Sequence, residues 1–158
     1  CTSGLPHGIR RLAREAPKVR LGLSIGSAIQ QKRRTLMPIA DAHDFADVLA
    51  AVAEHATLTG LAPMWAVTPL SGVNDSFEDG AALGAAARGF WESTGVRPRI
   101  SVIPYNPIDA VGDPYARASD DRHEDFVRGI ASTGYRVHFR YSGGGDVSAA
   151  CGQLAARG

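Results

Sequence analysis

The segment AACGQL at residues 149–154, which follows the glycine run GGG at 143–145, contains the residue best suited to covalent chemistry. Its cysteine, Cys151, stands between alanine and glycine, so that small neighbours leave its sulfur uncrowded. A thiolate is a strong nucleophile when its surroundings lower its pKa. The alternative is a small packed residue, which composition alone favours over a reactive thiol. The glycine run suits a hinge better than a phosphate loop, because it lacks both the P-loop lysine and the Rossmann spacing.

Other side chains give weaker chemical signals. The five histidines show no metal-ligand spacing, and the chain has neither a Cys-x-x-Cys pair nor a Gly-x-Ser-x-Gly elbow. We therefore expect the histidines at the surface or in satisfied packing. Asn106, between an expected strand end and a proline, either offers its amide to a polar ligand or serves as a turn residue. The basic run KRR at 32–34 is either a solvated helix face, which surface statistics favour, or a phosphate contact.

The bulk composition is typical of one soluble domain. The chain has 158 residues, is 44% hydrophobic and carries a net charge of +1, so no strong field directs it to nucleic acid or membrane. Its two cysteines, Cys1 and Cys151, lie at opposite ends, which favours reduced thiols in a cytosolic protein over a disulfide framework. The sequence shows no membrane-length apolar run and no signal peptide. Because the chain starts without Met, as if at a strand end, we expect it to be part of a longer protein.

Strands and helices are expected to alternate through nearly the whole chain. The clearest helix covers 44–58, where Phe45, Val48 and Val52 share one face and Gly60 provides a stop. The expected strands are short apolar or alternating runs at 20–25, 63–70, 99–103 and 135–140. The expected helices cover 9–14, 29–37, 44–58, 76–94, 119–132 and 147–155.

This alternation predicts an α/β fold with a parallel sheet built from βαβ units. Four strands are fewer than the eight of a closed barrel, so the count fits an open sheet or part of a larger barrel. In such folds the chemistry lies at the carboxyl ends of the strands. We therefore expect residues 24–26, 70–72, 103–106 and the glycine run before Cys151 to gather on one side.

Five short segments occur in an order and at a spacing that resemble those of the RlmN/Cfr family. They are TSG at 2–4, LMPI at 36–39, GVND at 72–75, IPYNP at 103–107 and AACGQL at 149–154. The resemblance covers essentially the whole chain, and the last segment is the most specific. Members of this family are radical S-adenosylmethionine methyltransferases that act on adenosine in 23S ribosomal RNA, and RlmN also acts on some transfer RNAs. Since the family fold is a partial (β/α)6 barrel, the resemblance implies that residues 1–158 form the C-terminal half of the radical core domain.

The resemblance also implies a role for each matching residue. Cys151 corresponds to the catalytic cysteine whose sulfur is first methylated by S-adenosylmethionine. A second molecule, cleaved at a [4Fe–4S] cluster, gives a radical that takes hydrogen from this methyl group, and the resulting carbon radical adds to adenine. The residues that match cofactor-binding positions are Cys1, which stands where the family usually has serine, and Ser24, Ile25, Gly26 and Asn106.

The rest of the machinery is expected upstream of Cys1. The resemblance places there the Cys-x-x-x-Cys-x-x-Cys cluster ligands and a second catalytic cysteine, so we expect these 158 residues alone to hold no metal and to be inactive. The implied partners are RNA and an electron donor such as flavodoxin. The implied location is the cytoplasm, away from membranes.

The chain departs from the family close to these matched positions. Gly26 stands where histidine is usual, and AIQQK at 28–32 replaces expected acidic residues. Near the catalytic cysteine, Gly143 replaces an arginine, while Gly145 and Ser148 replace aspartates. These departures leave open a divergent radical enzyme with another substrate. The absence of cluster ligands from this sequence leaves open a non-catalytic α/β fragment.

Overall fold

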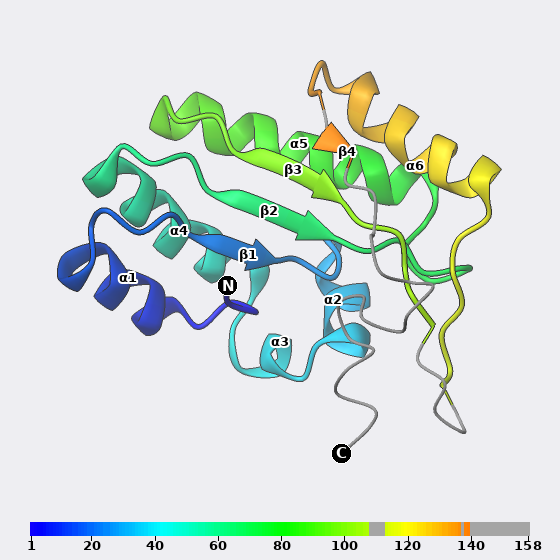
Figure 1. The fold of residues 1–158 in the computed structure, drawn as a ribbon, viewed down its shortest axis with the longest axis horizontal. Helices are drawn as coiled ribbons and strands as arrows, with labels where there is room; N and C mark the ends of the chain where they lie inside the picture. Colours follow the sequence, from blue (N-terminus) through cyan, green and yellow to red (C-terminus); the bar gives the residue numbers. More distant parts are fainter. Residues whose placement is uncertain (108–112, 137, 140–158) are drawn as a thin grey trace.

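The described residues form one parallel sheet with helices between its strands. In the computed structural model of the protein they are residues 1–107, 113–136 and 138–139. The strand order is β1-β2-β3-β4 (Figure 1). The strands are β1 (Gly22–Ser24), β2 (Met64–Val67), β3 (Arg99–Val102) and β4 (His138–Phe139). The helices are α1 (Pro6–Glu15), α2 (Gln30–Leu36), α3 (Ile39–Ala42), α4 (Phe45–Thr59), α5 (Phe77–Thr94) and α6 (Asp120–Ser132).

The sheet confirms the predicted α/β class, because β1 pairs with β2, β2 with β3 and β3 with β4, all in parallel. The structure adds the single turn α3, which has no side-chain cap and was not predicted. The helix predicted at 147–155 lies outside the described residues. None of the helices given above combines enough length with enough apolar character to cross a bilayer.

The start of the chain adds a short parallel segment beside β1. Thr2 forms an isolated parallel bridge with Leu23. Its N–H donates to the Gly22 carbonyl at 2.9 Å, and its own carbonyl accepts from the Ser24 N–H at 2.9 Å. The predicted strand end at the beginning of the chain is therefore present.

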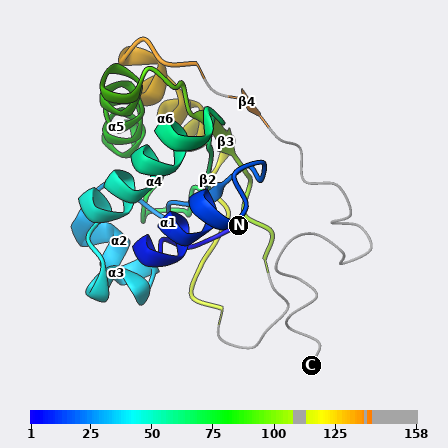
Figure 2. The ribbon, with the colours of Figure 1, turned by 90° about the vertical axis from the view of Figure 1, so that its left-hand side faces the viewer.

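The two faces of the sheet have different surroundings. Side chains at alternate positions, such as Leu23, Trp65 and Ile100, are at most 1% exposed and pack in the main hydrophobic core. Figure 2 shows α1, α4, α5 and α6 together on one side of the sheet. Because successive side chains of a strand point to opposite faces, Ser24 and Ala66 belong to the other face. Small and polar residues on that face leave room for a ligand.

Local capping positions α5 directly after the segment 72–75. The Ser76 hydroxyl accepts from the Asp79 N–H, and the Asp79 carboxylate accepts from the Ser76 N–H, both at 3.2 Å. This reciprocal pair satisfies backbone donors that the first helical turn leaves free. Asp79 is 3% exposed and also binds the Lys32 ammonium at 2.7 Å, which ties α2 to the start of α5.

The basic run at 32–34 contains one buried residue. Arg33 is 1% exposed, and its guanidinium donates to the His43 carbonyl at 2.9 Å and to the Ser3 carbonyl at 3.1 Å. It also lies 5.9 Å from the centroid of the Phe45 ring. The solvated interpretation is therefore wrong for Arg33, which acts as a buried clamp between the segment after Thr2 and the start of α4. The exposed neighbour Arg34 pairs with Asp44.

One histidine is buried in the core. His55 of α4 is 0% exposed, and its ring nitrogens have no hydrogen bond of ordinary geometry to the described residues. Burial lowers the pKa of His55, and the Val19 backbone opposes this shift less strongly. The ring therefore stays neutral in the folded protein near neutral pH. This residue departs from the expectation that each histidine is either superficial or satisfied.

We predict that Arg33→Met destabilises the full-length protein by about 2 to 4 kcal/mol, because it leaves two buried carbonyls without their donor. The control is Arg34→Met, which removes an exposed ion pair and should cost less than about 1 kcal/mol. Urea unfolding measures both values. An equally small loss of unfolding free energy in both variants would show that Arg33 does not hold these segments together.

Candidate functional site

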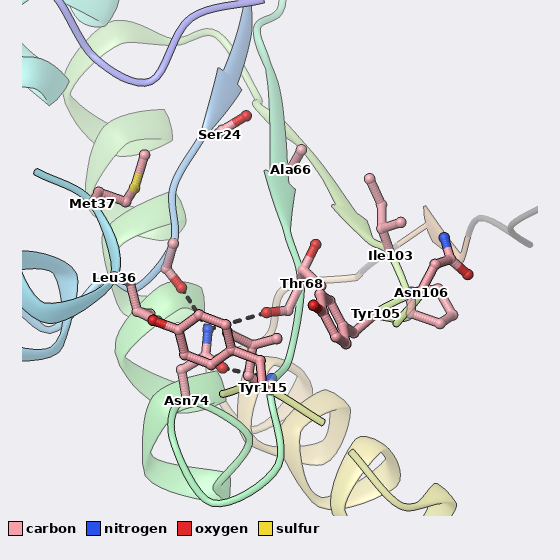
Figure 3. Close-up of a pocket in the computed structure, with 13 residues that line it drawn as sticks. Ser24, Leu36, Met37, Ala66, Thr68, Asn74, Ile103, Tyr105, Asn106 and Tyr115 are labelled. Atoms are coloured by element: carbon pink, nitrogen blue, oxygen red, sulfur yellow. Dashed lines mark hydrogen bonds between the residues drawn. The ribbon is translucent and has the colours of Figure 1, made fainter. Parts of the chain in front are cut away.

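A pocket lies where β1, β2 and β3 end. Its cavity volume is about 440 Å³, and it opens on the face of the sheet that the large helices leave free (Figure 3). Carboxyl ends of parallel strands meet at one edge of a sheet, which explains why distant segments converge here. The lining residues are Ser24, Gly26, Leu36, Met37, Ala66, Thr68, Leu70, Asn74, Ile103, Pro104, Tyr105, Asn106 and Tyr115.

The structure brings together three of the residues singled out from the sequence. Ser24, Gly26 and Asn106 come from the ends of β1 and β3, and all line this pocket (Figure 3). Ile25 does not, because its side chain is 1% exposed within the core. Its N–H donates to the Ala66 carbonyl at 2.9 Å, so Ile25 holds its two neighbours against β2.

Cys1 lies farther back along the sheet. The bridge between Thr2 and Leu23 places it level with Gly22, two residues before Ser24. A β-carbon built on Gly22 would lie 2.9 Å from the Cys1 sulfur, so the thiol covers that glycine. Cys1 is exposed and does not line the pocket.

Four residues singled out from the sequence belong to the segment that follows β4. Cys151, Gly143, Gly145 and Ser148 lie outside the described residues. The expected convergence is therefore confirmed for the ends of β1, β2 and β3, and it stays a prediction for the segment that follows β4.

Asn74 ties the strand ends together. Its amide nitrogen donates to the Gly26 carbonyl at 2.6 Å and to the Thr68 carbonyl at 3.1 Å. Its amide oxygen accepts from the Leu70 N–H at 2.7 Å, and the residue is only 1% exposed (Figure 3). The sequence analysis did not identify this role of Asn74. The available signal was its position within the GVND segment, one of the five matched to the family.

The next residue secures the same loop from the other side. Asp75 is 1% exposed and binds the Arg122 guanidinium of α6 at 2.8 Å. Burial by itself raises the pKa of Asp75, but the hydrogen bonds from Arg122 and from the Gly72 N–H outweigh it and lower the pKa. The carboxylate therefore stays charged and anchors the loop to α6.

Gly26 is required by its own surroundings. Its φ is +68°, in the left-handed region, and a β-carbon there would lie 2.6 Å from the Met37 sulfur. Met37 therefore fills the space that a side chain at position 26 would need. A larger residue at position 26 would therefore require Met37 to move.

Two aromatic rings stand at the mouth of the pocket. The Tyr105 hydroxyl donates to one Asp113 carboxylate oxygen at 2.7 Å, and the Tyr115 N–H donates to the other at 3.0 Å. Asp113 thereby fixes both segments relative to each other. The sequence analysis assigned no role to these tyrosines, because isolated aromatic residues carry no spacing signal.

A buried hydroxyl lies beside the pocket. Ser101 is paired in register with Ala66, and Ile103, two residues further along, lines the pocket, so all three share one face. Ser101 is 3% exposed, and its hydroxyl has no hydrogen-bond partner among the described residues. A buried hydroxyl without a partner costs about 1 to 3 kcal/mol, so a polar group placed against it would be favoured.

Metal ligands are not gathered at this site. Within the described ranges no group of three or more His, Cys, Asp or Glu side chains could hold a metal ion. The whole sequence contains two cysteines. The pocket therefore offers hydroxyl, amide and aromatic groups to an organic ligand.

The chain is similar to several RNA methyltransferases. It is 54% identical over 169 residues to a probable RNA methyltransferase of Sorangium cellulosum, covering 98% of this chain and 43% of that protein. It is 36% identical to the dual-specificity RNA methyltransferase RlmN of Anaeromyxobacter, covering 99% of this chain and 39% of that protein. It is 33% identical to the ribosomal RNA large subunit methyltransferase Cfr of Staphylococcus aureus, covering 97% of this chain and 44% of that protein. The chain thus spans about two fifths of the length of these curated relatives.

Solved structures agree on the fold. A radical SAM methyltransferase from Sphaerobacter thermophilus matches with a TM-score of 0.85 and 33% identity, covering 96% of this chain and 42% of that one. A domain of pyruvate-formate lyase-activating enzyme from Bacteroides vulgatus matches with a TM-score of 0.60 over 87% of this chain and 76% of that one, but at 12% identity it shows the fold alone. No family model matches the chain. The predicted resemblance and the predicted part of a larger barrel are both confirmed.

We predict that Asn74→Ala destabilises the full-length protein by about 2 to 4 kcal/mol, because two carbonyls and one N–H lose a buried partner. The matched control is Ser71→Ala in the same loop, where an exposed side chain is removed and the change should stay within about 0.5 kcal/mol. Urea unfolding measures both. A loss below about 1 kcal/mol for Asn74→Ala would show that the strand ends do not depend on it.

Proposed function

We propose that this chain, a divergent homologue of the RlmN and Cfr RNA methyltransferases, forms the C-terminal half of the core domain of a radical S-adenosylmethionine enzyme that methylates RNA. The observation that carries this proposal is the pocket at the strand ends. Three residues matched to cofactor contacts, Ser24, Gly26 and Asn106, line it together although they are far apart in the sequence.

The residues of the pocket fit S-adenosylmethionine. The Ser24 hydroxyl and the Asn106 amide offer polar contacts, while Leu36 and Met37 supply an apolar wall. The Ser101 hydroxyl, which has no hydrogen-bond partner within the described part of the chain, lies on the same face and suits a polar group of the ligand. When bound, S-adenosylmethionine would supply a transferable methyl group and, after reductive cleavage, an oxidising radical.

Two matched residues act less directly. We assign Ile25 a positioning role, because its side chain is in the core while its backbone holds the end of β1 against β2. Cys1 lies on the edge next to β1, level with Gly22, so we propose that it contacts the part of the cofactor that extends along the open face.

The cluster must be held by residues other than these. Two cysteines are too few for a [4Fe–4S] cluster, which is bound mainly by cysteine thiolates, so we propose that its ligands belong to another part of the protein. The cleavage of S-adenosylmethionine requires an electron, and a small redox protein such as flavodoxin is the proposed donor. An RNA substrate and this donor are consistent with a cytoplasmic protein.

We propose that Cys151 accepts the methyl group before it reaches RNA. Its thiolate attacks the methyl carbon, a carbon–sulfur bond forms, and the sulfonium sulfur of the cofactor leaves with the electron pair of the broken bond. The glycine run at 143–145 would let this sulfur move between cofactor and RNA. The proposed substrate is an adenosine carbon in 23S ribosomal RNA, with transfer RNA as a further substrate.

Gly26 motivates a second candidate function. The histidine that the resemblance implies is absent from the pocket, where Met37 packs against Gly26. A related radical enzyme with a different substrate would tolerate such a change at the site. The same assay separates the two candidates, because this second enzyme would cleave S-adenosylmethionine without methylating ribosomal or transfer RNA.

We predict that Cys151→Ala abolishes methyl-adenosine formation, lowering it at least about a thousandfold, because the methyl acceptor is lost. The full-length protein is reconstituted anaerobically with cluster, reductant, S-adenosylmethionine and RNA, and nucleosides are quantified after digestion. The control is S-adenosylmethionine binding, which Cys151→Ala should retain. Methylation that persists in this variant would refute the assigned role.

A further inference from the structure

The segments that lead into the strands meet at the end of the sheet opposite the pocket. They are residues 16–21, 60–63, 95–99 and 134–136. In Figure 1 the arrows of β1, β2 and β3 point away from this end, and β4 pairs in parallel with β3. They contain five basic residues and no acidic one. The basic residues are Lys18, Arg20, Arg97, Arg99 and Arg136. The chain as a whole has a net charge of only +1, so positive charge is concentrated at this end.

Three of these arginines share one depression. Arg97, Arg99 and Arg136 line a hollow of about 580 Å³ together with the ends of the preceding helices, and we call these three residues the basic depression. All three are exposed. Among the described residues, no carboxylate lies within ion-pair distance of them. By contrast, Arg10 pairs with Glu54 at 2.7 Å and Arg11 with Glu15 at 2.8 Å.

An aromatic frame holds one of the arginines. The Arg97 guanidinium carbon lies 5.2 Å from the Trp91 ring centroid and 4.9 Å from the Tyr135 ring centroid. Tyr135 is 3% exposed, and its hydroxyl donates to the Pro98 carbonyl, so this side of the frame is fixed. Trp91 is 42% exposed and lines a second hollow with Tyr135.

Helix ends alone do not account for this arrangement. Carbonyls at a helix C-terminus attract cations, and α5 ends next to the basic depression. That attraction explains neither three arginines in one hollow nor an exposed tryptophan stacked on one of them. Unpaired cations for phosphates, with an aromatic face beside them for bases, are the combination that binds single-stranded nucleic acid.

We propose that the basic depression binds the phosphate backbone of the RNA substrate and that the exposed face of Trp91 stacks on one of its bases. The inference rests on the proposed function in taking RNA as the substrate. It adds a second contact, at the far end of the sheet from the pocket. The longest described strands have four residues, about 13 Å, so a folded RNA easily extends from one end to the other.

This contact contributes binding and leaves the chemical step alone. An interaction remote from the reacting atoms, equal in the ground and transition states, lowers KM without changing kcat. Each phosphate neutralised also contributes about 0.7 to 0.9 to the slope of log affinity against log salt. Three arginines therefore contribute about two to three to that slope.

The test uses the full-length protein and unmodified 23S ribosomal RNA transcribed in vitro. Binding is measured by filter retention over a series of potassium chloride concentrations. The variant Arg97→Gln/Arg99→Gln/Arg136→Gln should lower the magnitude of the slope by about two to three. The matched control, Arg10→Gln/Arg11→Gln/Arg128→Gln, removes the same charge from arginines that pair with carboxylates on helix surfaces, and it should keep the wild-type slope.

Two further variants guard against misfolding and isolate the stacking. The double variant Arg99→Gln/Arg136→Gln keeps Arg97 and its contacts with Trp91 and Tyr135. It should lower the magnitude of the slope by about two thirds as much as the triple variant does. Trp91→Leu should weaken binding roughly fivefold or more with the slope unchanged, because it removes stacking and no charge. Steady-state methylation should show a raised KM and the wild-type kcat in the triple variant.

The outcomes separate this inference from the proposed function. If the wild type methylates the RNA but the triple variant keeps the wild-type slope and KM, the proposed RNA contact at the basic depression is refuted and the proposed function is not. An equal slope change in the control would also overturn it, because bulk charge would then explain the binding. A wild type that methylates no RNA would refute the proposed function instead.

Discussion

The pocket depends on one buried amide. Asn74 supplies hydrogen-bond partners for three backbone groups beyond the last paired residues of β1 and β2, at Gly26, Thr68 and Leu70. Only a side chain with both a donor and an acceptor can do this at one position. The loops that shape the site are therefore held by a core-like interaction. The side chains that line the pocket are then not needed to hold these loops and can contact a ligand.

Other buried polar side chains also hold segments outside the sheet in place. Arg33 binds two backbone carbonyls below α2, and Asp79 joins Lys32 to the first turn of α5. Strands of two to four residues provide few ladder hydrogen bonds, so buried polar side chains take over much of the positioning. These residues serve the site without lining it, apart from Asn74.

Much of this arrangement could be predicted from the sequence, and the failures have physical causes. The helical spacing of apolar residues and the residues at the helix ends predicted α4 and α5. Parallel pairing of the strands predicted that Ser24 and Asn106 lie close together. Arg33 was misjudged because charge patterns report polarity and not packing. Cys1, which the resemblance matches to a cofactor position, lies farther back than Ser24 because of the register of Thr2 with Leu23, and no pattern in the sequence indicates this register. Hydrogen bonds between distant loops, such as those of Asn74, leave no periodic trace.

The central claim is that the joined strand ends bind S-adenosylmethionine. Hydrogen–deuterium exchange of the anaerobic, cluster-loaded full-length protein, with and without S-adenosylmethionine, tests it most directly. Binding is expected to slow amide exchange at residues 24–27, 68–74 and 103–106, while the amides at 90–98 exchange as before. Unchanged exchange at the strand ends, with protection confined to other segments, would contradict the account.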